Sequence, residues 1–510
     1  MRGKKIGVIL GYLAMLIQNL ASFILTPLLI VAFGDGDFGV YKLVLSISSY
    51  FALADLGLSN AIVRYISEYK ARKDKISESK FVSLIILIDV LAASVLMLIG
   101  IFMYSKLPVI FGSSFLTSEL NLLKSLFFLT LINGIFNLFT NLTSGIIKSY
   151  ENFGLLKVIN ILRTFVRFGA ALTLITFGKG AFSIILLDTI LSFLVLASTT
   201  YYCIVKLRIK VSFNLLSKKY AKEILSYSII VFIDAIAFHL FWNADNFIIG
   251  IFLSSSAIAV YSIGTQISSL FFSFSIIVSD VIMPGIVTQV TNKASDEELT
   301  ISMIKIGRIK LILIALPVIG FIFLGKSFIN FWVGDGYTEA YSIALLVIIP
   351  SMIAAVYDAG LYIMWAKNKH KVKSIVSLII SGLNIVITVV LVRLIGIIGA
   401  AIGTAFAYTV GYILFNTLYF HRVLNLNMII FLKKTLKKIW IPIIATSAFA
   451  LIISQMGQLS LIYFMIKVIM ITIIYVLLML KLGLNEEEKT MISNILEKSV
   501  RTNRDGENNQ

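Results

Sequence analysis

The chain has 510 residues, of which 59% are hydrophobic and 14% are charged, and its mean hydropathy is +0.96. Soluble proteins hold about 45–50% apolar and about 25% charged residues, so this composition excludes a soluble globular protein. It predicts an all-α polytopic membrane protein. The net charge of +18 would suit nucleic-acid binding, but the positions of the charges argue against it.

Apolar stretches long enough to cross a bilayer as helices recur along the whole chain. The first has features of a signal peptide but lacks a small-residue cleavage site, so we expect it to be retained. Fourteen helices are predicted, at residues 6–31, 40–66, 81–105, 121–147, 155–177, 181–205, 222–250, 259–288, 306–324, 340–366, 374–394, 398–420, 438–455 and 459–481.

The loops between these helices support the count. With the N-terminus in the cytoplasm, the inner segments hold 34 of the 44 Lys and Arg residues and the outer segments hold 4. The positive-inside rule predicts this distribution for an even number of helices with both termini cytoplasmic. The positive charge therefore reflects topology and attraction to anionic lipid.

An internal repeat relates the two halves of the chain with an offset of 220 residues. The segment Gly39-Val40-Tyr41 matches Ala259-Val260-Tyr261. The same offset aligns polar residues inside otherwise apolar helices: Asn19 with His239, Thr26 with Asn246, Ser46 with Gln266, Ser49 with Ser269 and Asn60 with Asp280. The repeat predicts two parallel six-helix lobes, at 1–205 and 206–421. Helices 13 and 14 follow at 422–484, and a cytoplasmic tail spans 485–510.

Four motifs in this order resemble the polysaccharide-transporter branch of the MOP flippase superfamily, which includes the Wzx-type flippases. They are Asp37-Phe38-Gly39-Val40-Tyr41, Asp55-Leu56-Gly57-Leu58-Ser59-Asn60-Ala61 with Arg64, Asn243-Ala244-Asp245-Asn246-Phe247-Ile248-Ile249-Gly250 with Val260-Tyr261-Ser262, and Gly396-Ile397-Ile398-Gly399-Ala400-Ala401-Ile402-Gly403-Thr404-Ala405. The resemblance implies two lobes around a central cavity. It also implies that an undecaprenyl-pyrophosphate-linked oligosaccharide is flipped across the bacterial cytoplasmic membrane by alternating access. The resemblance leaves the pathway open among O-antigen of lipopolysaccharide, capsule and exopolysaccharide.

Several polar residues are candidates for the lining of this cavity, where hydroxyls and amides would bind the sugar. They are Asn19, Ser49, Asn60, Asn246 and Gln266. The alternative is that these side chains form interhelical hydrogen bonds that hold the bundle, each contributing about 0.6–2 kcal/mol.

Four cations inside the helices are candidates for binding the pyrophosphate. Arg163 and Arg167 share a face of one helix, and guanidinium groups bind phosphate through paired hydrogen bonds. The alternative for this face is a salt bridge to Asp188 or Asp55. Arg64 lies near the predicted cytoplasmic boundary, where it either meets the phosphate or anchors its helix at the headgroups. Lys467 is isolated in an apolar helix, so it should face protein or a groove.

Four titratable residues are candidates for coupling transport to an ion: Asp245, Asp280, His239 and Asp55. Intramembrane carboxylates are costly and commonly functional, and the pKa of histidine lies near physiological pH. Packing is the alternative for His239, and a salt bridge to an arginine is the alternative for Asp55.

The sequence contains none of the common catalytic motifs, so we expect a transporter and neither a cofactor nor a bound metal. Two other functions stay open: a cation-coupled multidrug exporter of the same superfamily, and a membrane-embedded glycosyl or acyl transferase or polymerase. The expected partners are the lipid-linked oligosaccharide, the bilayer, and the polymerase and chain-length machinery, with the protein itself a monomer.

Overall fold

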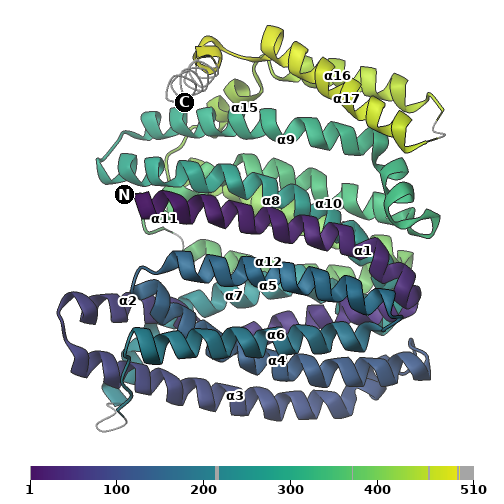
Figure 1. The fold of residues 1–510 in the computed structure, drawn as a ribbon. Helices are drawn as coiled ribbons and strands as arrows, with labels where there is room; N and C mark the ends of the chain where they lie inside the picture. The colour runs from purple at the N-terminus through teal and green to yellow at the C-terminus, as the bar shows by residue number, and fades with distance from the viewer. Residues whose placement is uncertain (1, 213–217, 370, 458–459, 491–492, 494–510) are drawn as a thin grey trace, which may run out of the picture. The chain divides into compact units, whose positions relative to one another are not determined.

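The computed structural model describes residues 2–212, 218–369, 371–457, 460–490 and 493. Within these, the side chains of 2–14, 218–231, 274 and 276–282 are outside the description. The described backbone is helical almost throughout (Figure 1), as the composition predicted.

Two compact units make up the chain. Unit 1 comprises Met1–Ile267, Ser342–Ala344 and His370–Ala407, and unit 2 comprises Ser268–Tyr341, Leu345–Lys369 and Tyr408–Gln510. Unit 1 contains α1 (Arg2–Phe51), η1 (Ala52–Asp55), α2 (Leu58–Ala71), α3 (Lys75–Phe111), α4 (Thr117–Ser149), α5 (Phe153–Thr176), α6 (Ala181–Tyr201), η2 (Tyr202–Lys206), α7 (Lys218–Phe252), the first part of α8 (Ser255–Thr291), α12 (Lys371–Ile395) and α13 (Ile397–Ala407).

Unit 2 contains the rest of α8 and the C-terminal helices. Their bounds are α9 (Asp296–Val333), η3 (Asp335–Tyr337), α10 (Glu339–Val356), α11 (Asp358–Ala366), η4 (Tyr408–Leu414), α14 (Phe415–Arg422), α15 (Met428–Leu436), α16 (Trp440–Ser454), α17 (Leu461–Leu478) and η5 (Met479–Gly483). Within this unit α9 packs against α11, α15, α16 and α17, so α9 is its central helix.

Two breaks shape the N-terminal part of unit 1. Gly34 has φ 76° and divides α1, so the predicted helices 6–31 and 40–66 meet at a sharp turn there. A second break follows η1, where Leu56 (φ 50°) and Gly57 (φ 75°) are both left-handed. Only glycine adopts that region without a steric cost, so the break at Leu56 is strained.

Gly39 explains one of the repeated motifs physically. A Cβ at this position would lie 1.8 Å from the carbonyl oxygen of Ser255, at the start of α8. Glycine therefore lets α1 and α8 approach closely, and any side chain there would separate them.

Each of the fourteen predicted segments falls on a helix. Among the described residues, eleven helices are long and apolar enough to span a membrane, or twelve if α15 and α16, bent by 50°, form one span. The eleven combine the first two predicted helices as Met15–Ala71 and do not include α8. The predicted fold class of a many-helix membrane protein is confirmed, whereas the number fourteen stays a prediction.

α9 begins ten residues before the predicted helix at 306–324. Ser295 accepts a hydrogen bond from the Glu298 backbone, and the Glu298 carboxylate accepts one from the Ser295 backbone. This capping box starts the helix at Asp296. As a result Lys305, which precedes the predicted helix, also lies on α9.

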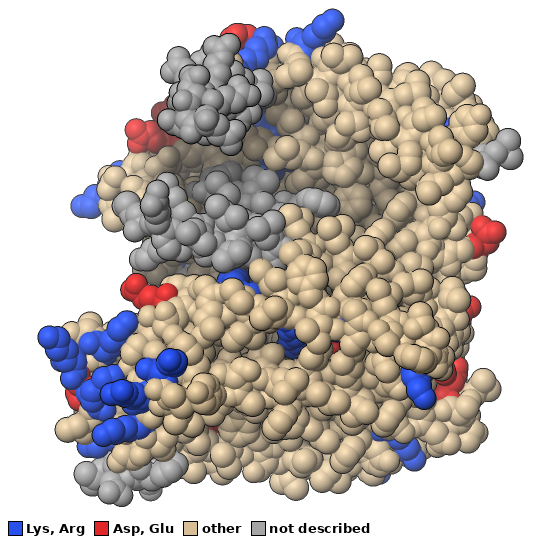
Figure 2. Space-filling model, in the orientation of Figure 1, with Lys and Arg blue, Asp and Glu red and all other residues tan. Residues whose placement is uncertain are grey.

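Figure 2 shows Lys and Arg gathered over the region of α2 and the start of α3, while most of the same face is uncharged. Lys70, Arg72, Lys73 and Lys75 are exposed there. This is the inner segment 70–80 of the predicted topology, and its charge suits contact with anionic headgroups.

Candidate substrate-binding and ion-coupling sites

A cluster of positive side chains lies between α1, α5 and α6 in unit 1. Arg167 of α5 forms a two-point salt bridge with Asp188 of α6, with Nε–Oδ1 and Nη2–Oδ2 distances of 2.5 and 3.0 Å. Nη2 also donates to the Tyr41 hydroxyl at 3.2 Å. Of the two partners that the sequence analysis weighed for this arginine, Asp188 is the one in contact. Nη1 has no partner among the residues that the structure describes, and the Arg167 side chain is 27% exposed.

Two further cations complete this group, which we call the cationic cluster (Lys42, Arg163 and Arg167). Arg163 donates from Nη2 to Ser192 at 2.9 Å, and its charge acts on that of Arg167. Lys42 of α1 donates to Gln266 at 2.9 Å, lies over the Phe38 ring and is also repelled by Arg167. With Asp188 as the counterion, three cations and one carboxylate carry a net charge of +2. The sequence analysis did not name Lys42, whose only signal is a charge directly after the repeated motif Gly39-Val40-Tyr41.

Two hydrogen-bonded pairs connect the repeated helices within unit 1. Gln266 donates to Thr26 at 2.8 Å, and Asn246 donates to Ser46 at 2.7 Å. The 220-residue offset aligns Thr26 with Asn246 and Ser46 with Gln266, so each pair is the counterpart of the other. Asn246 and Gln266 therefore form interhelical hydrogen bonds, which were the alternative to lining a cavity.

The other predicted sugar-binding residues differ in exposure. Ser49 bonds to the carbonyl of Ser46 in its own helix, at 2.7 Å. Asn19 is half-buried, and Asn60 is exposed. Arg64 is exposed on α2, where its guanidinium lies 5.5 Å from the centre of the Tyr65 ring.

Asp245 lies at the centre of a buried group of oxygen atoms. It is 3% exposed on α7, and it accepts hydrogen bonds from Tyr261 of α8, Thr404 of α13 (2.7 Å) and Thr388 of α12 (3.2 Å). Asn384 completes the group with its Oδ1 3.4 Å from Thr388 Oγ1, and its Nδ2 has no partner among the described residues.

Gly403 leaves the space that this oxygen group needs. A Cβ there would lie 2.5 Å from Thr388 Oγ1 and 3.2 Å from Asn384 Oδ1. Carboxylate, hydroxyl and amide oxygens are the donors that hard cations prefer. The sequence analysis named Asp245 as a candidate but not Asn384 or Thr388, and it quoted Thr404 only within a motif, because single hydroxyl and amide residues in apolar helices carry no spacing signal. Among the described residues no three His, Cys, Asp or Glu side chains gather as a metal-binding group.

The remaining ion-coupling candidates lie apart from Asp245. His239 is half-buried beside Tyr50, with ring centroids 6.3 Å apart, and its Nδ1 is enclosed without a hydrogen-bond partner in the described part of the chain. Asp55 accepts two hydrogen bonds from Ser59, one from the hydroxyl at 2.7 Å and one from the backbone at 3.2 Å. The side chain of Asp280 lies outside the described residues.

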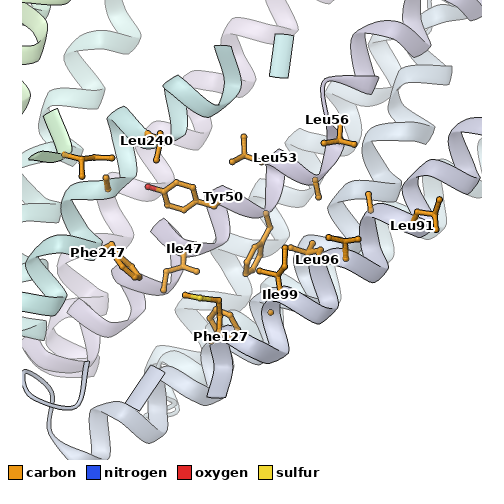
Figure 3. A pocket seen from close by; sticks show the side chains of 18 of the residues that line it. Ile47, Tyr50, Leu53, Leu56, Leu91, Leu96, Ile99, Phe127, Leu240 and Phe247 are labelled. Carbon is orange, nitrogen blue, oxygen red and sulfur yellow. The ribbon is translucent and has the colours of Figure 1, made fainter. Parts of the chain in front are cut away.

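An apolar cavity of about 850 Å³ opens within unit 1 between η1 and helices α1, α3, α4 and α7. Figure 3 shows Ile47, Leu53, Leu96 and Phe127 around it and the Tyr50 hydroxyl as the oxygen among the drawn side chains. A wall of this kind favours hydrocarbon and offers almost no hydrogen bonds to a sugar. The cavity can therefore hold a lipid chain but not an oligosaccharide.

Unit 2 contains a buried ion pair that the sequence analysis missed. Lys310 of α9 is fully buried, and its ammonium lies 2.6 Å from Asp358, 3.0 Å from the Ala355 carbonyl and 3.3 Å from the Ser275 hydroxyl. Tyr357 separates α10 from α11, so Lys310 binds the carbonyl end of one helix and the first residue of the next.

Two further cations in unit 2 bind backbone carbonyls. Lys467 is 5% exposed on α17 and donates to the carbonyl of Met456, just beyond α16, at 2.5 Å. Arg308 of α9 pairs with Glu488 and also donates to the carbonyls of Lys437 and Gly483. The Arg308 contacts connect α9 to the segments that follow α15 and α17.

Comparison with known proteins places the sequence in context. Residues 4–288 match the sequence model of the family described as "Polysaccharide biosynthesis protein". The chain is 25% identical over 444 residues to the "Uncharacterized membrane protein EpsK" of Bacillus subtilis, covering 82% of this chain and 83% of that protein. It is 23% identical over 383 residues to the "Probable low-salt glycan biosynthesis flippase Agl15" of Haloferax volcanii, covering 75% and 76%.

Solved structures share the fold. The lipid II flippase MurJ in its inward closed conformation aligns with a TM-score of 0.72 and 15% identity, covering 93% of this chain and 97% of that one. An inward-facing multidrug resistance transporter of the MATE family in the MOP superfamily aligns with a TM-score of 0.64 and 14% identity, covering 79% and 94%. The chain therefore has the fold of these transporters.

Proposed function

Since this chain belongs to the family of polysaccharide biosynthesis proteins, we propose that it flips an undecaprenyl-pyrophosphate-linked oligosaccharide across the bacterial cytoplasmic membrane, with both termini in the cytoplasm. The relatives named above include a probable flippase of glycan biosynthesis. The MurJ structure is that of a lipid II flippase. The substrate proposed here has three parts, a sugar, a phosphate and a hydrocarbon, and each part needs a different surface.

The observation that carries this proposal is the cationic cluster within membrane-spanning helices. Its net charge of +2 favours an anion, and Nη1 of Arg167 is available to a phosphate oxygen without disrupting the salt bridge to Asp188. Guanidinium groups hold phosphate through paired hydrogen bonds. Arg64, exposed on α2, is proposed as the first phosphate contact at the cytoplasmic mouth, and Lys467 as a further one.

The hydrocarbon and sugar parts of the substrate have their own proposed sites. The apolar cavity beside Tyr50 suits a segment of the polyprenyl chain. Asn19, Ser49, Asn60, Asn246 and Gln266 are proposed to contact the sugar as the two lobes, 1–205 and 206–421, exchange access. Opening on alternate sides requires that the substrate bind the two states with different affinity.

Asp245 is proposed to couple this exchange to a small cation or proton. Tyr261, Thr388 and Thr404 all donate to its carboxylate, and these hydroxyls can turn their lone pairs toward a cation. His239 and Asp280 are secondary candidates for the same role. We further propose that the chain works as a monomer beside a polymerase and chain-length machinery, in the synthesis of O-antigen, capsule or exopolysaccharide.

Export of surface polysaccharide tests the proposal in a strain that lacks this protein. The wild-type chain restores export, whereas Arg167→Ala and Arg64→Ala restore none at equal protein level. Arg167→Lys and Arg64→Lys restore part, because lysine keeps the charge but not the paired donors. Full export by both alanine variants would refute their roles. Drug resistance conferred without export would favour the multidrug exporter, and turnover of a sugar nucleotide or acyl donor would favour the transferase.

A further inference from the structure

Asp89 of α3 is a buried carboxyl group with an unsatisfied oxygen atom in the described part of the chain. It is 2% exposed, and its Oδ1 is enclosed with no partner among the residues that the structure describes. A buried carboxylate that lacks donors is costly, because nothing replaces the water that would solvate its charge. A neutral carboxylic acid at the same place avoids most of this cost.

The neighbouring carboxyl group, Asp55, is also largely buried, which disfavours its charge, but unlike Oδ1 of Asp89 it has hydrogen-bond donors among the described residues. It ends η1 and accepts two hydrogen bonds from Ser59 in the first turn of α2. The positive charge of Lys148 also acts on it. A helix N-terminus, hydrogen-bond donors and a nearby cation all stabilise an ionised carboxylate.

The two groups act on each other electrostatically. α3 packs against η1, α2, α4 and α7. From these elements, Asp55 is the charged group that acts on Asp89, and Lys148 acts on Asp55. The other titratable groups nearby have different neighbours: Arg64 of α2 lies over Tyr65, and His239 of α7 lies beside Tyr50. Two carboxyl groups so arranged share one proton more easily than they carry two negative charges.

The backbone beside Asp55 can change their separation. Leu56 and Gly57, both left-handed, join the rigid helices α1 and α2 directly after Asp55. A strained break between two helices is a place where a transporter can bend. Bending there would move the Asp55 carboxylate relative to α3 and so alter the repulsion that it exerts on Asp89.

We infer that Asp55 and Asp89 form a proton-exchange site, in which Asp89 carries the proton while Asp55 is ionised, and bending at Leu56-Gly57 releases it. In that step the O–H bond of Asp89 breaks, the electron pair stays on the carboxylate, and the proton passes to water near partly exposed Asp55. The reverse step takes a proton from water. This inference rests on the proposed transport function and names a site for proton coupling that is separate from Asp245.

Infrared spectroscopy of the reconstituted full chain tests the site without any substrate. The wild type should show the C=O stretch of a buried protonated carboxyl at neutral pH. The band should be absent in Asp89→Asn and unchanged in Asp335→Asn, which alters an exposed carboxylate. In Asp55→Asn the band should disappear at a lower pH, because the repulsion is gone. A wild type without the band, or a band that persists in Asp89→Asn, would overturn the inference.

A chemical probe gives a second readout that needs no variant. Apolar carbodiimides react with protonated buried carboxyl groups, and the cavity lined by Ile88 and Leu56 offers a path to the chain beside Asp89. Mass spectrometry should find the adduct on Asp89 at neutral pH and much less of it at alkaline pH. Labelling of Asp55 with none on Asp89 would contradict the assigned roles. Neither readout depends on flipping, so a failed transport assay with a positive infrared result would count against the proposed function alone.

Discussion

Asn246 and Ser46 are joined by a 2.7 Å hydrogen bond whose counterpart, between Gln266 and Thr26, occupies the positions related by the 220-residue offset. Each bond connects a helix of the first repeat to a helix of the second. Asn246 and Gln266, which were predicted to line a cavity, thus hold the repeated helices together in this state. In an alternating-access transporter such bonds are expected to break and re-form as the lobes move.

These bonds should be weak and independent. Ser46→Ala and Thr26→Ala should each lower the free energy of unfolding by about 0.6–2 kcal/mol. A double-mutant cycle within a pair should show coupling, and a cycle between Ser46 and Thr26 should be additive. Thermal denaturation in detergent measures both. Strong coupling between the two pairs would indicate one shared network instead of two separate contacts.

Arg167 and Asp188 should have unequal effects on transport. Arg167→Ala removes the proposed phosphate ligand and should abolish export, whereas Asp188→Asn keeps the arginine and should retain a measurable part. Export and protein level are measured together. Equal loss in the two variants would show that the ion pair itself, and not the guanidinium, is what transport needs.

Asp245→Asn should remove the ion dependence of transport while leaving the fold intact, because the amide oxygen can still accept from Tyr261 and Thr404 and the amide NH2 can donate to the Thr388 hydroxyl oxygen. Transport into vesicles under imposed cation and proton gradients measures this dependence. Asp234→Asn, about three turns away on the same face of α7, is the matched control and should respond to the gradients as the wild type does. Retained gradient dependence in Asp245→Asn would exclude this residue as the coupling site.

Lys310→Met should destabilise unit 2 by about 3–5 kcal/mol, since it leaves Asp358 and the Ala355 carbonyl without their cation. Adding Asp358→Asn should recover part of the loss. Lys305→Ala is the matched control, because Lys305 lies on the same helix with a side chain 57% exposed. A melting temperature of Lys310→Met equal to that of the control would contradict the importance of this pair.

The free energy of unfolding should also depend on pH through Glu488. Burial acts to raise the pKa of Glu488, but hydrogen bonds from Arg308 and the Asn485 backbone hold this pKa below its usual value. A carboxyl with a lowered pKa stabilises the fold above its unfolded pKa of about 4.3, and this contribution is lost as the pH falls through the lower, folded value. The melting temperature of Glu488→Gln should therefore fall less steeply than that of the wild type as the pH is lowered. Glu487→Gln, which replaces a side chain that is 71% exposed, should behave as the wild type.

The sequence predicted the helices well, because long apolar stretches are a strong signal. The resemblance to the polysaccharide-transporter branch of the MOP superfamily is confirmed by the family match. Individual partners were harder to predict. Asp188 was one of two alternatives for Arg167, because helix periodicity gives a face but not the helix that packs on it.

Two groups escaped the sequence analysis for physical reasons. Lys310 lies inside the predicted helix at 306–324, but the sequence does not show that Asp358 and the Ala355 carbonyl pack against it. Thr388 and Thr404 lie 143 and 159 residues from Asp245, and only the packing of α12 and α13 on α7 brings them to it. Contacts of this kind have no local signature, because hydroxyl side chains also occur in membrane helices merely to bond their own backbone.

The most direct test of the central claim is flipping by the purified chain in liposomes that carry a fluorescent, short-chain polyprenyl-pyrophosphate-linked oligosaccharide. The fraction of substrate accessible to a membrane-impermeant quencher reports translocation. The wild type should move substrate to the inner leaflet, and the Lys42→Ala/Arg167→Ala variant, with its cationic cluster reduced, should move little above empty liposomes. Equal translocation by the wild type and this variant, or none by a folded wild type under an imposed ion gradient, would contradict the account.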